Sequence, residues 1–171
     1  MKRRHTPQRL LPPLLPLLLP MLMWLPLKAP HPALARSAVP TFPADLQPLL
    51  AALKRARYEV RLEKPPQQGA YGLTDSRKRR IWIAPISIEL GIVRATLIHE
   101  AVHAAQGCPK GRLKPIGWSV DLERTIELEI SGLLYRGYPR GSFEIEREAF
   151  SMQSHPRAIP MLITALEQRC R

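Results

Sequence analysis

The chain has 171 residues, 45% of them hydrophobic, and a formal net charge of +12 at pH 7. This length predicts a single domain. The part of the sequence from residue 36 onward contains no internal repeat, and no motif typical of nucleic-acid-binding proteins is recognisable. The excess of positive charge favours anionic surfaces, such as a lipid membrane or the cell envelope. We therefore expect no nucleic-acid partner, and the sequence leaves the oligomeric state open.

The first 35 residues have the pattern of a secretory signal peptide. A basic start is followed by a leucine- and proline-rich run, Leu10 to Leu27, and by a small-residue site, Ala33 to Ala35. Because the prolines weaken a helix, an N-terminal membrane anchor and a disordered leader are alternatives. We expect an exported protein, periplasmic or secreted, with a linker at 36–43 and one domain at 44–171. Cleavage after Ala35 removes five basic residues and no acidic ones, which lowers the net charge to +7.

The N-terminal part of the domain predicts one helix and two strands. Residues 45–57 have apolar side chains at helical spacing behind a capping Asp45. Residues 58–62 (YEVRL) and 80–84 (RIWIA) alternate as strands do, and Pro85 ends the second. Between them, PPQQGAYG and TDS predict a loop and a turn, and we interpret the basic run RKRR as the solvated tip of a hairpin.

The second half of the domain predicts four helices. Apolar residues recur at helical spacing over the ranges 87–106, 120–137, 143–153 and 158–170. Gly107 is placed to end the first of these helices. One helix, two short strands and four further helices together predict an α+β domain with a small sheet.

The segment HEAVH places His99, Glu100 and His103 on one helix. Residues four apart project from the same face, so both imidazoles can bind one metal ion. Glu100 can then contact a water on that ion without binding the metal itself. Zinc lowers the pKa of its water to about 7, and the carboxylate acts as general base. The alternative is a core helix with two partly buried histidines, but buried polar groups without partners are unfavourable.

A catalytic zinc ion needs a third protein ligand, and the nearest positions do not provide one. The three-histidine extension of this motif is absent, because Gln106 and Pro109 occupy its places. One carboxylate of the downstream helix can bind zinc while another supports a histidine. The alternative is a solvated acidic face that pairs with nearby arginines. That helix offers three candidates: Glu144, Glu146 and Glu148.

The two cysteines, Cys108 and Cys170, form an even pair, which in an exported protein predicts a disulfide. The bridge would tie the loop after the HEAVH helix to the C-terminal end. In a reducing compartment both residues would stay as thiols. Because Cys108 lies five residues after His103, a role as a zinc ligand is an alternative to the disulfide.

HEAVH and, more weakly, EREAF resemble zinc metallopeptidases of the gluzincin type, the group that includes thermolysin. The resemblance covers about residues 80–155 and implies a compact zincin-like fold, in which a sheet packs on the active-site helix. It also implies that a glutamate of a later helix is the third ligand. In that group the ligand glutamate is often followed by an alanine, either directly or three positions on. Ala149 lies three positions after Glu146 and directly after Glu148. We slightly favour Glu146, and Glu144 stays open.

Zincins carry a substrate-binding edge strand before this helix, and RIWIA stands in that place, which implies that Trp82 and Ile83 line the edge. The resemblance implies zinc-dependent hydrolysis of a peptide bond in a peptide or protein substrate. One departure is the lack of an acidic residue four positions after Glu146. It keeps a catalytically inactive zinc-binding domain as an alternative, beside a basic envelope- or membrane-binding protein without metal. The candidates to stabilise an oxyanion are Tyr135, Tyr138 and His155.

Overall fold

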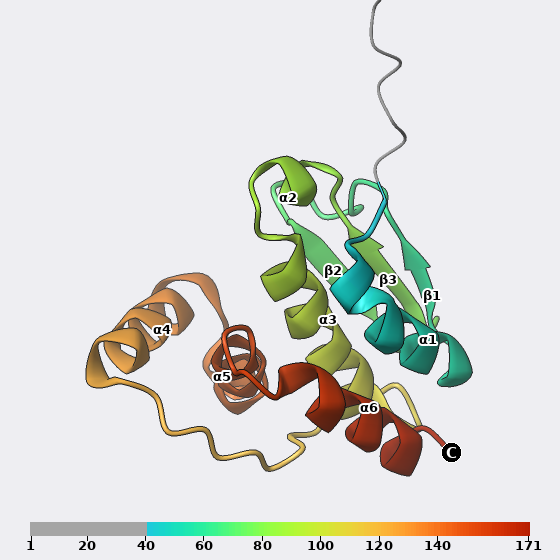
Figure 1. The fold of residues 1–171 in the computed structure, drawn as a ribbon. Helices are drawn as coiled ribbons and strands as arrows, with labels where there is room; N and C mark the ends of the chain where they lie inside the picture. Colours follow the sequence, from blue (N-terminus) through green and yellow to red (C-terminus); the bar gives the residue numbers. More distant parts are fainter. Residues whose placement is uncertain (1–40) are drawn as a thin grey trace, which may run out of the picture. The chain divides into compact units, whose positions relative to one another are not determined.

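Figure 1 shows the computed structural model, which describes residues 41–171. The predicted leader at 1–35 and most of the linker at 36–43 lie outside these residues. The described part is mixed α+β, as predicted. None of the helices in it is both long and apolar enough to cross a lipid bilayer. In chain order the elements are η1 (Ala44–Leu46), α1 (Gln47–Arg55), β1 (Glu59–Arg61), β2 (Gly72–Asp75), β3 (Arg80–Ile83), α2 (Ile86–Glu89), α3 (Val93–Gly107), α4 (Arg124–Gly137), η2 (Arg140–Ser142), α5 (Phe143–Met152) and α6 (Ala158–Arg169).

The three strands form one mixed sheet in the order β1–β3–β2. β1 runs parallel to β3, with Val60 beside Ile81, and β2 runs antiparallel to β3, with Leu73 beside Trp82. β1 and β3 confirm the two predicted strands. β2 lies where a loop and a turn were predicted, and this third strand makes RIWIA the centre of the sheet.

A tight turn holds β2 against β3. The Asp75 carboxylate accepts hydrogen bonds from the backbone N–H groups of Arg77 at 3.1 Å and Lys78 at 3.0 Å. Arg79 then adopts a left-handed backbone with φ of 51°, and the chain returns as β3. The basic run is thus the tip of a hairpin, as interpreted from the sequence. The strand before it was missed because its sequence, GLTD, has no apolar alternation and contains two residues that are rare in strands.

The helix predicted over 87–106 is in fact two helices. Gly91 has φ of 70°, a conformation that glycine adopts without steric cost. The chain therefore leaves α2 and changes direction before α3 begins at Val93. α3 ends at Gly107, as predicted, and a side chain there would collide with Ser76, 2.3 Å from the added Cβ.

α3 is the central helix of the domain. The sheet, α5 and α6 all pack against it (Figure 1). Of its 15 residues, 12 are buried, so its polar side chains must find partners inside the protein. Small residues permit close neighbours: Tyr58 Oη donates to the Ala104 carbonyl at 3.0 Å, and Arg169 Nε donates to the Ala105 carbonyl at 3.0 Å.

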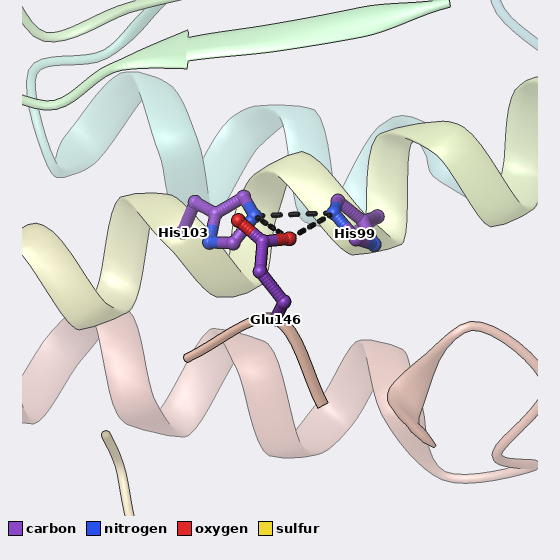
Figure 2. A group of neighbouring side chains, drawn as sticks. All are labelled: His99, His103 and Glu146. Carbon is purple, nitrogen blue, oxygen red and sulfur yellow. Dashed lines mark hydrogen bonds and ion pairs between the residues drawn. The ribbon is translucent and has the colours of Figure 1, made fainter. Parts of the chain in front are cut away.

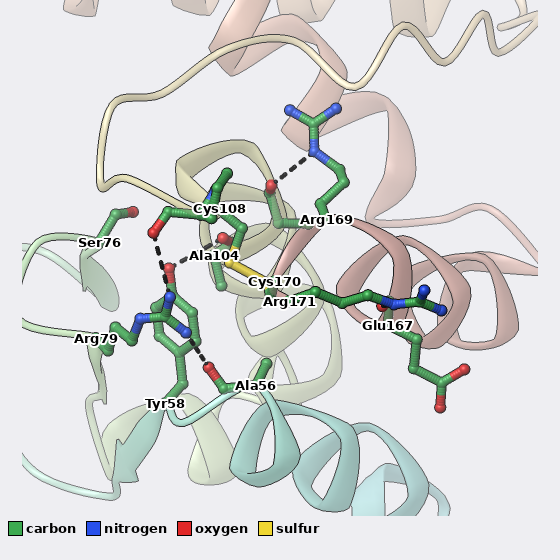
Figure 3. Close-up of a disulfide and its surroundings, with 12 residues drawn as sticks. Ala56, Tyr58, Ser76, Arg79, Ala104, Cys108, Glu167, Arg169, Cys170 and Arg171 are labelled. Carbon is green, nitrogen blue, oxygen red and sulfur yellow. Dashed lines mark hydrogen bonds between the residues drawn. A yellow bond between two sulfur atoms is a disulfide. The ribbon is translucent and has the colours of Figure 1, made fainter.

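The C-terminal helices α5 and α6 also pack against α3, in addition to the sheet. α5 packs on α3, α4 packs on α5, and α6 packs on both α1 and α3. The predicted disulfide is present, because Cys108 after α3 is bonded to Cys170 after α6 (Figure 3). This bond uses the Cys108 sulfur, which removes that residue from the candidate zinc ligands. The helix predicted from residue 120 begins only at Arg124.

Candidate metal centre

Three possible ligand atoms converge between α3 and α5 (Figure 2). The Nε2 atoms of His99 and His103 lie 3.1 Å apart, and Glu146 Oε2 lies 3.4 Å and 3.3 Å from them. Ligands that sit about 2.05 Å from a zinc ion at tetrahedral angles are about 3.3 Å from one another. The three side chains therefore already have the spacing of one face of a tetrahedral zinc site.

Glu146 supplies an independent sign that a cation fits here. Its Oε2 atom is buried and has no hydrogen-bond partner among the described residues; both histidines are within ion-pair distance, but neither is aligned to donate. A buried oxygen without a partner is unfavourable, and a metal ion would satisfy it. Burial acts to raise the pKa of Glu146, but the imidazoles of His103 and His99 lower it to about 2. The carboxylate is thus ionised at neutral pH and could serve as a metal ligand.

A chain of hydrogen bonds fixes the orientation of His103. Gln106 Nε2 donates to the Ile145 carbonyl at 2.9 Å and to Glu148 Oε2 at 2.8 Å. Because both partners accept, the amide oxygen of Gln106 is left to accept the Nδ1–H of His103 at 2.8 Å. Nδ1 therefore carries a proton, and Nε2 is the atom that could bind a metal. Burial acts to lower the pKa of His103, but Glu146 and Glu100 raise it overall, so a metal ion at Nε2 would compete with protons for this nitrogen.

His99 has a simpler support. The side-chain amide of Gln153 lies 2.9 Å from His99 Nδ1 and makes no other hydrogen bond within the described part of the chain. It can therefore turn its oxygen toward the ring. Binding of a metal at Nε2 requires a proton on Nδ1, and the amide oxygen of Gln153 can then accept a hydrogen bond from that Nδ1–H. The ring of Phe150 packs edge-on against His99, with 4.7 Å between ring centroids.

Glu100 lies beside the ligand set and is not one of the converging atoms. It is 6% exposed, and its carboxylate is turned toward β2. Thr74 Oγ1 lies 2.8 Å from Glu100 Oε2 and 2.9 Å from the Glu100 carbonyl oxygen. Burial raises the pKa of Glu100, while the imidazoles of His99 and His103 and the hydroxyl of Thr74 act in the opposite direction. A raised pKa suits a carboxylate that takes up a proton.

A cavity of about 670 Å³ opens over these side chains. Its walls are the loop and strand at 67–74, the N-terminal half of α3, and α5. Two carboxylates, Glu100 and Glu146, face it, and none of the described residues that line it is a lysine or an arginine. The positive charge of the chain is therefore not concentrated at this cavity. Its apolar lining includes Ile92, Leu113 and Phe150.

The other predicted candidates lie elsewhere. Glu148 is buried and does not join the three atoms, because four donors occupy its oxygens: Gln106 Nε2 at 2.8 Å and the backbone N–H groups of Ile116, Gly117 and Trp118 at 2.7–2.8 Å. Glu144 is exposed. The expectation that a second carboxylate contacts a histidine is not met: Gln106 and Gln153 are the partners of the two rings, and Glu148 reaches His103 only through Gln106.

Three aromatic candidates were proposed as oxyanion stabilisers, and one lines the cavity. Tyr138 faces it, whereas Tyr135 is 73% exposed and His155 lies outside the lining. The prediction that Trp82 and Ile83 form the substrate edge is wrong, because β3 pairs on both sides and β2 provides the edge beside α3.

Sequence reasoning missed the residues that hold this site in place. Gln106 was noted only as a departure from the three-histidine motif, although its position three residues after His103 puts it on the same helix face. Gln153 follows Glu146 by seven residues, two turns of α5, which was an available signal. Thr74 gave no signal, because its strand was not predicted.

No family model, no curated protein and no solved structure matches this chain. The function is therefore inferred from the geometry of the site. That geometry defines a cluster of two buried histidines and a partly buried glutamate that could hold a metal ion, with the buried Glu100 beside it and a cavity above.

Proposed function

We propose that the domain is a zinc-dependent peptide hydrolase with a zincin-like arrangement. His99, His103 and Glu146 bind the ion, and Glu100 is the general base. The observation that carries this proposal is the convergence of three ligand atoms within 3.1–3.4 Å of one another, one of them a buried oxygen without a hydrogen bond.

The donor set favours zinc. Two imidazole nitrogens and one carboxylate oxygen form a three-ligand set typical of catalytic zinc sites, which keep a fourth position open. When bound, zinc supplies a Lewis acid and a water whose pKa falls to about 7. The disulfide Cys108–Cys170 supports folding in an oxidising compartment, which agrees with the proposed export to the periplasm or the exterior.

The chain itself would bind substrate along β2. Ala84 N–H donates to the Tyr71 carbonyl at 2.8 Å, and hydrogen bonds alternate along an antiparallel pair. The backbone groups of Gly72 and Thr74 therefore point away from β3, at the free edge of the sheet, and both residues line the cavity. An extended peptide can pair with this edge and pass over the metal centre beside Glu100.

Tyr138 is placed to stabilise negative charge on a reacting carbonyl oxygen. It lines the cavity, and its ring packs edge-on against Phe150, with 5.9 Å between centroids. Burial raises the pKa of its hydroxyl, and the carboxylates of Glu146 and Glu100 raise it further. The phenol therefore stays protonated and can donate a hydrogen bond to an oxyanion.

A non-catalytic zinc-binding domain is the second candidate. One observation favours it: amides, Gln106 and Gln153, support the two histidines, whereas carboxylates or backbone carbonyls commonly do so in catalytic zinc sites. The two functions share a ligand set and differ only in whether a peptide is cleaved.

Metal analysis and a peptide-cleavage assay on the purified chain test the proposal. We expect one zinc ion per chain, lost in His99→Ala and strongly weakened in Glu146→Gln. Glu144→Gln, an exposed change on the same helix, is the matched control and should keep zinc. Glu100→Gln should keep zinc and lose about 10²–10⁴-fold of the hydrolysis rate.

Three results would contradict parts of this scheme. Stoichiometric zinc without cleavage of any peptide would support the non-catalytic domain. Absence of zinc at every concentration would leave HEAVH as a core helix and favour an envelope- or membrane-binding role. Full activity in Glu100→Gln would exclude this residue as the base.

A further inference from the structure

Two residues of β2 hold Glu100 without belonging to the metal ligand set. Gly72 and Thr74 are two positions apart on the strand, so they face α3 from the same side. Thr74 Oγ1 lies 2.8 Å from Glu100 Oε2. Gly72 packs so closely that a Cβ at this position would lie 2.6 Å from Glu100 Oε1 and 2.8 Å from Thr96 Cγ2.

The two oxygens of the Glu100 carboxylate therefore have different surroundings. Oε2 is bound to Thr74, while Oε1 lies against the bare Cα of Gly72 and has no hydrogen-bond partner among residues 41–171. The backbone of Gly72 is not left-handed, so glycine is needed there for space and not for conformation. Rotation about the last torsion of a glutamate is soft, and without Thr74 nothing else at this strand would hold the carboxylate plane.

We propose that Thr74 and Gly72 are positioning residues for Glu100, an inference that rests on the proposed function. Thr74 fixes Oε2, and Gly72 leaves the room in which Oε1 meets the attacking water. A general base acts only within hydrogen-bond reach of the proton that it takes, and a misplacement of about 1 Å can cost about a hundredfold in rate. The strand whose edge can pair with the peptide thus also orients the base. Both the substrate and the Glu100 carboxylate would be held by β2, which fixes their positions relative to each other.

The variants Thr74→Val and Thr74→Ser, made in the full chain, test this role. Valine keeps the shape and removes the hydroxyl. We expect kcat to fall about 10- to 100-fold with KM and zinc content unchanged, and serine to restore kcat to within a few-fold. A purely structural role would lower the melting temperature of Thr74→Val and leave kcat alone. In the Glu100→Gln background, Thr74→Val should have no further effect on the residual rate.

Gly72→Ala tests the space beside Oε1. The added methyl group should displace the carboxylate and lower kcat while Thr74 and the metal ligands remain intact. Gly141→Ala is the control, because no atom lies within 4 Å of the Cβ it would add. Equal kcat for Gly72→Ala and the wild type would overturn the role given to Gly72.

A readout that does not depend on activity separates this inference from the proposed function. Crystal structures of the wild type and Thr74→Val, in the metal state in which they are isolated, report the position of the Glu100 carboxylate. Rotation or displacement of the carboxylate in the valine variant supports the positioning role, even if the wild type binds zinc and cleaves no peptide. An unmoved carboxylate in that variant overturns it, whether or not the protein is an enzyme.

Discussion

Replacement of Glu148 by alanine distinguishes a residue that orients a ligand from a residue that binds the metal. In the structure Glu148 is 7% exposed and accepts four hydrogen bonds, one from Gln106 Nε2 and three from the backbone N–H groups of residues 116–118. The alanine variant removes all four acceptor contacts at once. Gln106 then loses one of the two bonds that fix its amide, and through it His103 loses a fixed partner.

The size of the effect follows from these contacts. A hydrogen bond to a charged group contributes about 1.5–3 kcal/mol, and water can reach the half-buried loop at 116–118 and replace part of what is lost. We therefore expect the free energy of unfolding to fall by about 3–5 kcal/mol, because a buried donor left without an acceptor costs about 1–3 kcal/mol and water satisfies some of the four donors. Zinc affinity should fall about 10- to 100-fold, as for other residues that support a ligand.

Urea unfolding of the metal-free protein and zinc competition with a chelator measure the two effects separately. Glu148→Gln, which keeps the volume and one acceptor oxygen, should give intermediate values and is the fallback if the alanine variant does not fold. Glu146→Gln should show the reverse pattern, with a small change in stability and a large loss of zinc. Wild-type zinc affinity in both Glu148 variants would refute the idea that Glu148 orients His103 through Gln106. Complete loss of zinc in a folded variant would indicate that Glu148 is itself a ligand.

Four other outcomes are expected. Replacement of both Cys108 and Cys170 by serine opens a loop with a sequence separation of 62 and should cost about 4 kcal/mol by chain entropy, measured by urea unfolding; an unchanged midpoint would contradict this. Tyr138→Phe should lower kcat about 10²–10³-fold with zinc retained, whereas an unchanged kcat removes its role. Gln153→Ala should weaken zinc about tenfold or more in the chelator assay. Zinc at 100 times its dissociation constant should stabilise the domain by about 2.7 kcal/mol. Calorimetry that shows no rise in the unfolding temperature would argue against a zinc site in the folded domain.

The two histidines are held by uncharged amides and not by carboxylates, which affects the charge of the site. Gln106 and Gln153 orient the rings but carry no charge, so the nearest anions to the metal position are Glu146 and Glu100. With a divalent cation bound and both carboxylates ionised, the charges of the ion and the two carboxylates sum to zero. If the proposed function is right, a neutral centre in a cavity whose described lining holds no lysine or arginine would not favour acidic substrates, in spite of the net positive charge of the chain.

The local features of this protein could be read from its residues in order. The spacing of His99 and His103 puts both rings on one face wherever the segment is helical, and the strands at β1 and β3 follow from apolar alternation. Gly107 ends α3 as expected. The break at Gly91 was not predicted in the helix over 87–106, because the apolar pattern continues across it although the backbone turns there with φ of 70°.

The remaining parts depend on contacts between segments far apart in the chain. β2 exists because GLTD pairs with β3 and packs on α3, which no property of those four residues alone requires. Glu146 and Glu148 are separated by about 200° around α5, so the rotation of that helix against α3 decides which carboxylate meets the histidines.

The sequence by itself therefore determined the central helix and the placement on it of two histidines and the adjacent Glu100, because helical periodicity is a local property. Only the tertiary structure decided that Glu146 completes the cluster, that Glu148 supports His103 through Gln106, and that Thr74 holds Glu100. The physical reason is that each of these relations joins different elements, and a hydrogen bond or ligand distance of about 3 Å is set by how those elements pack.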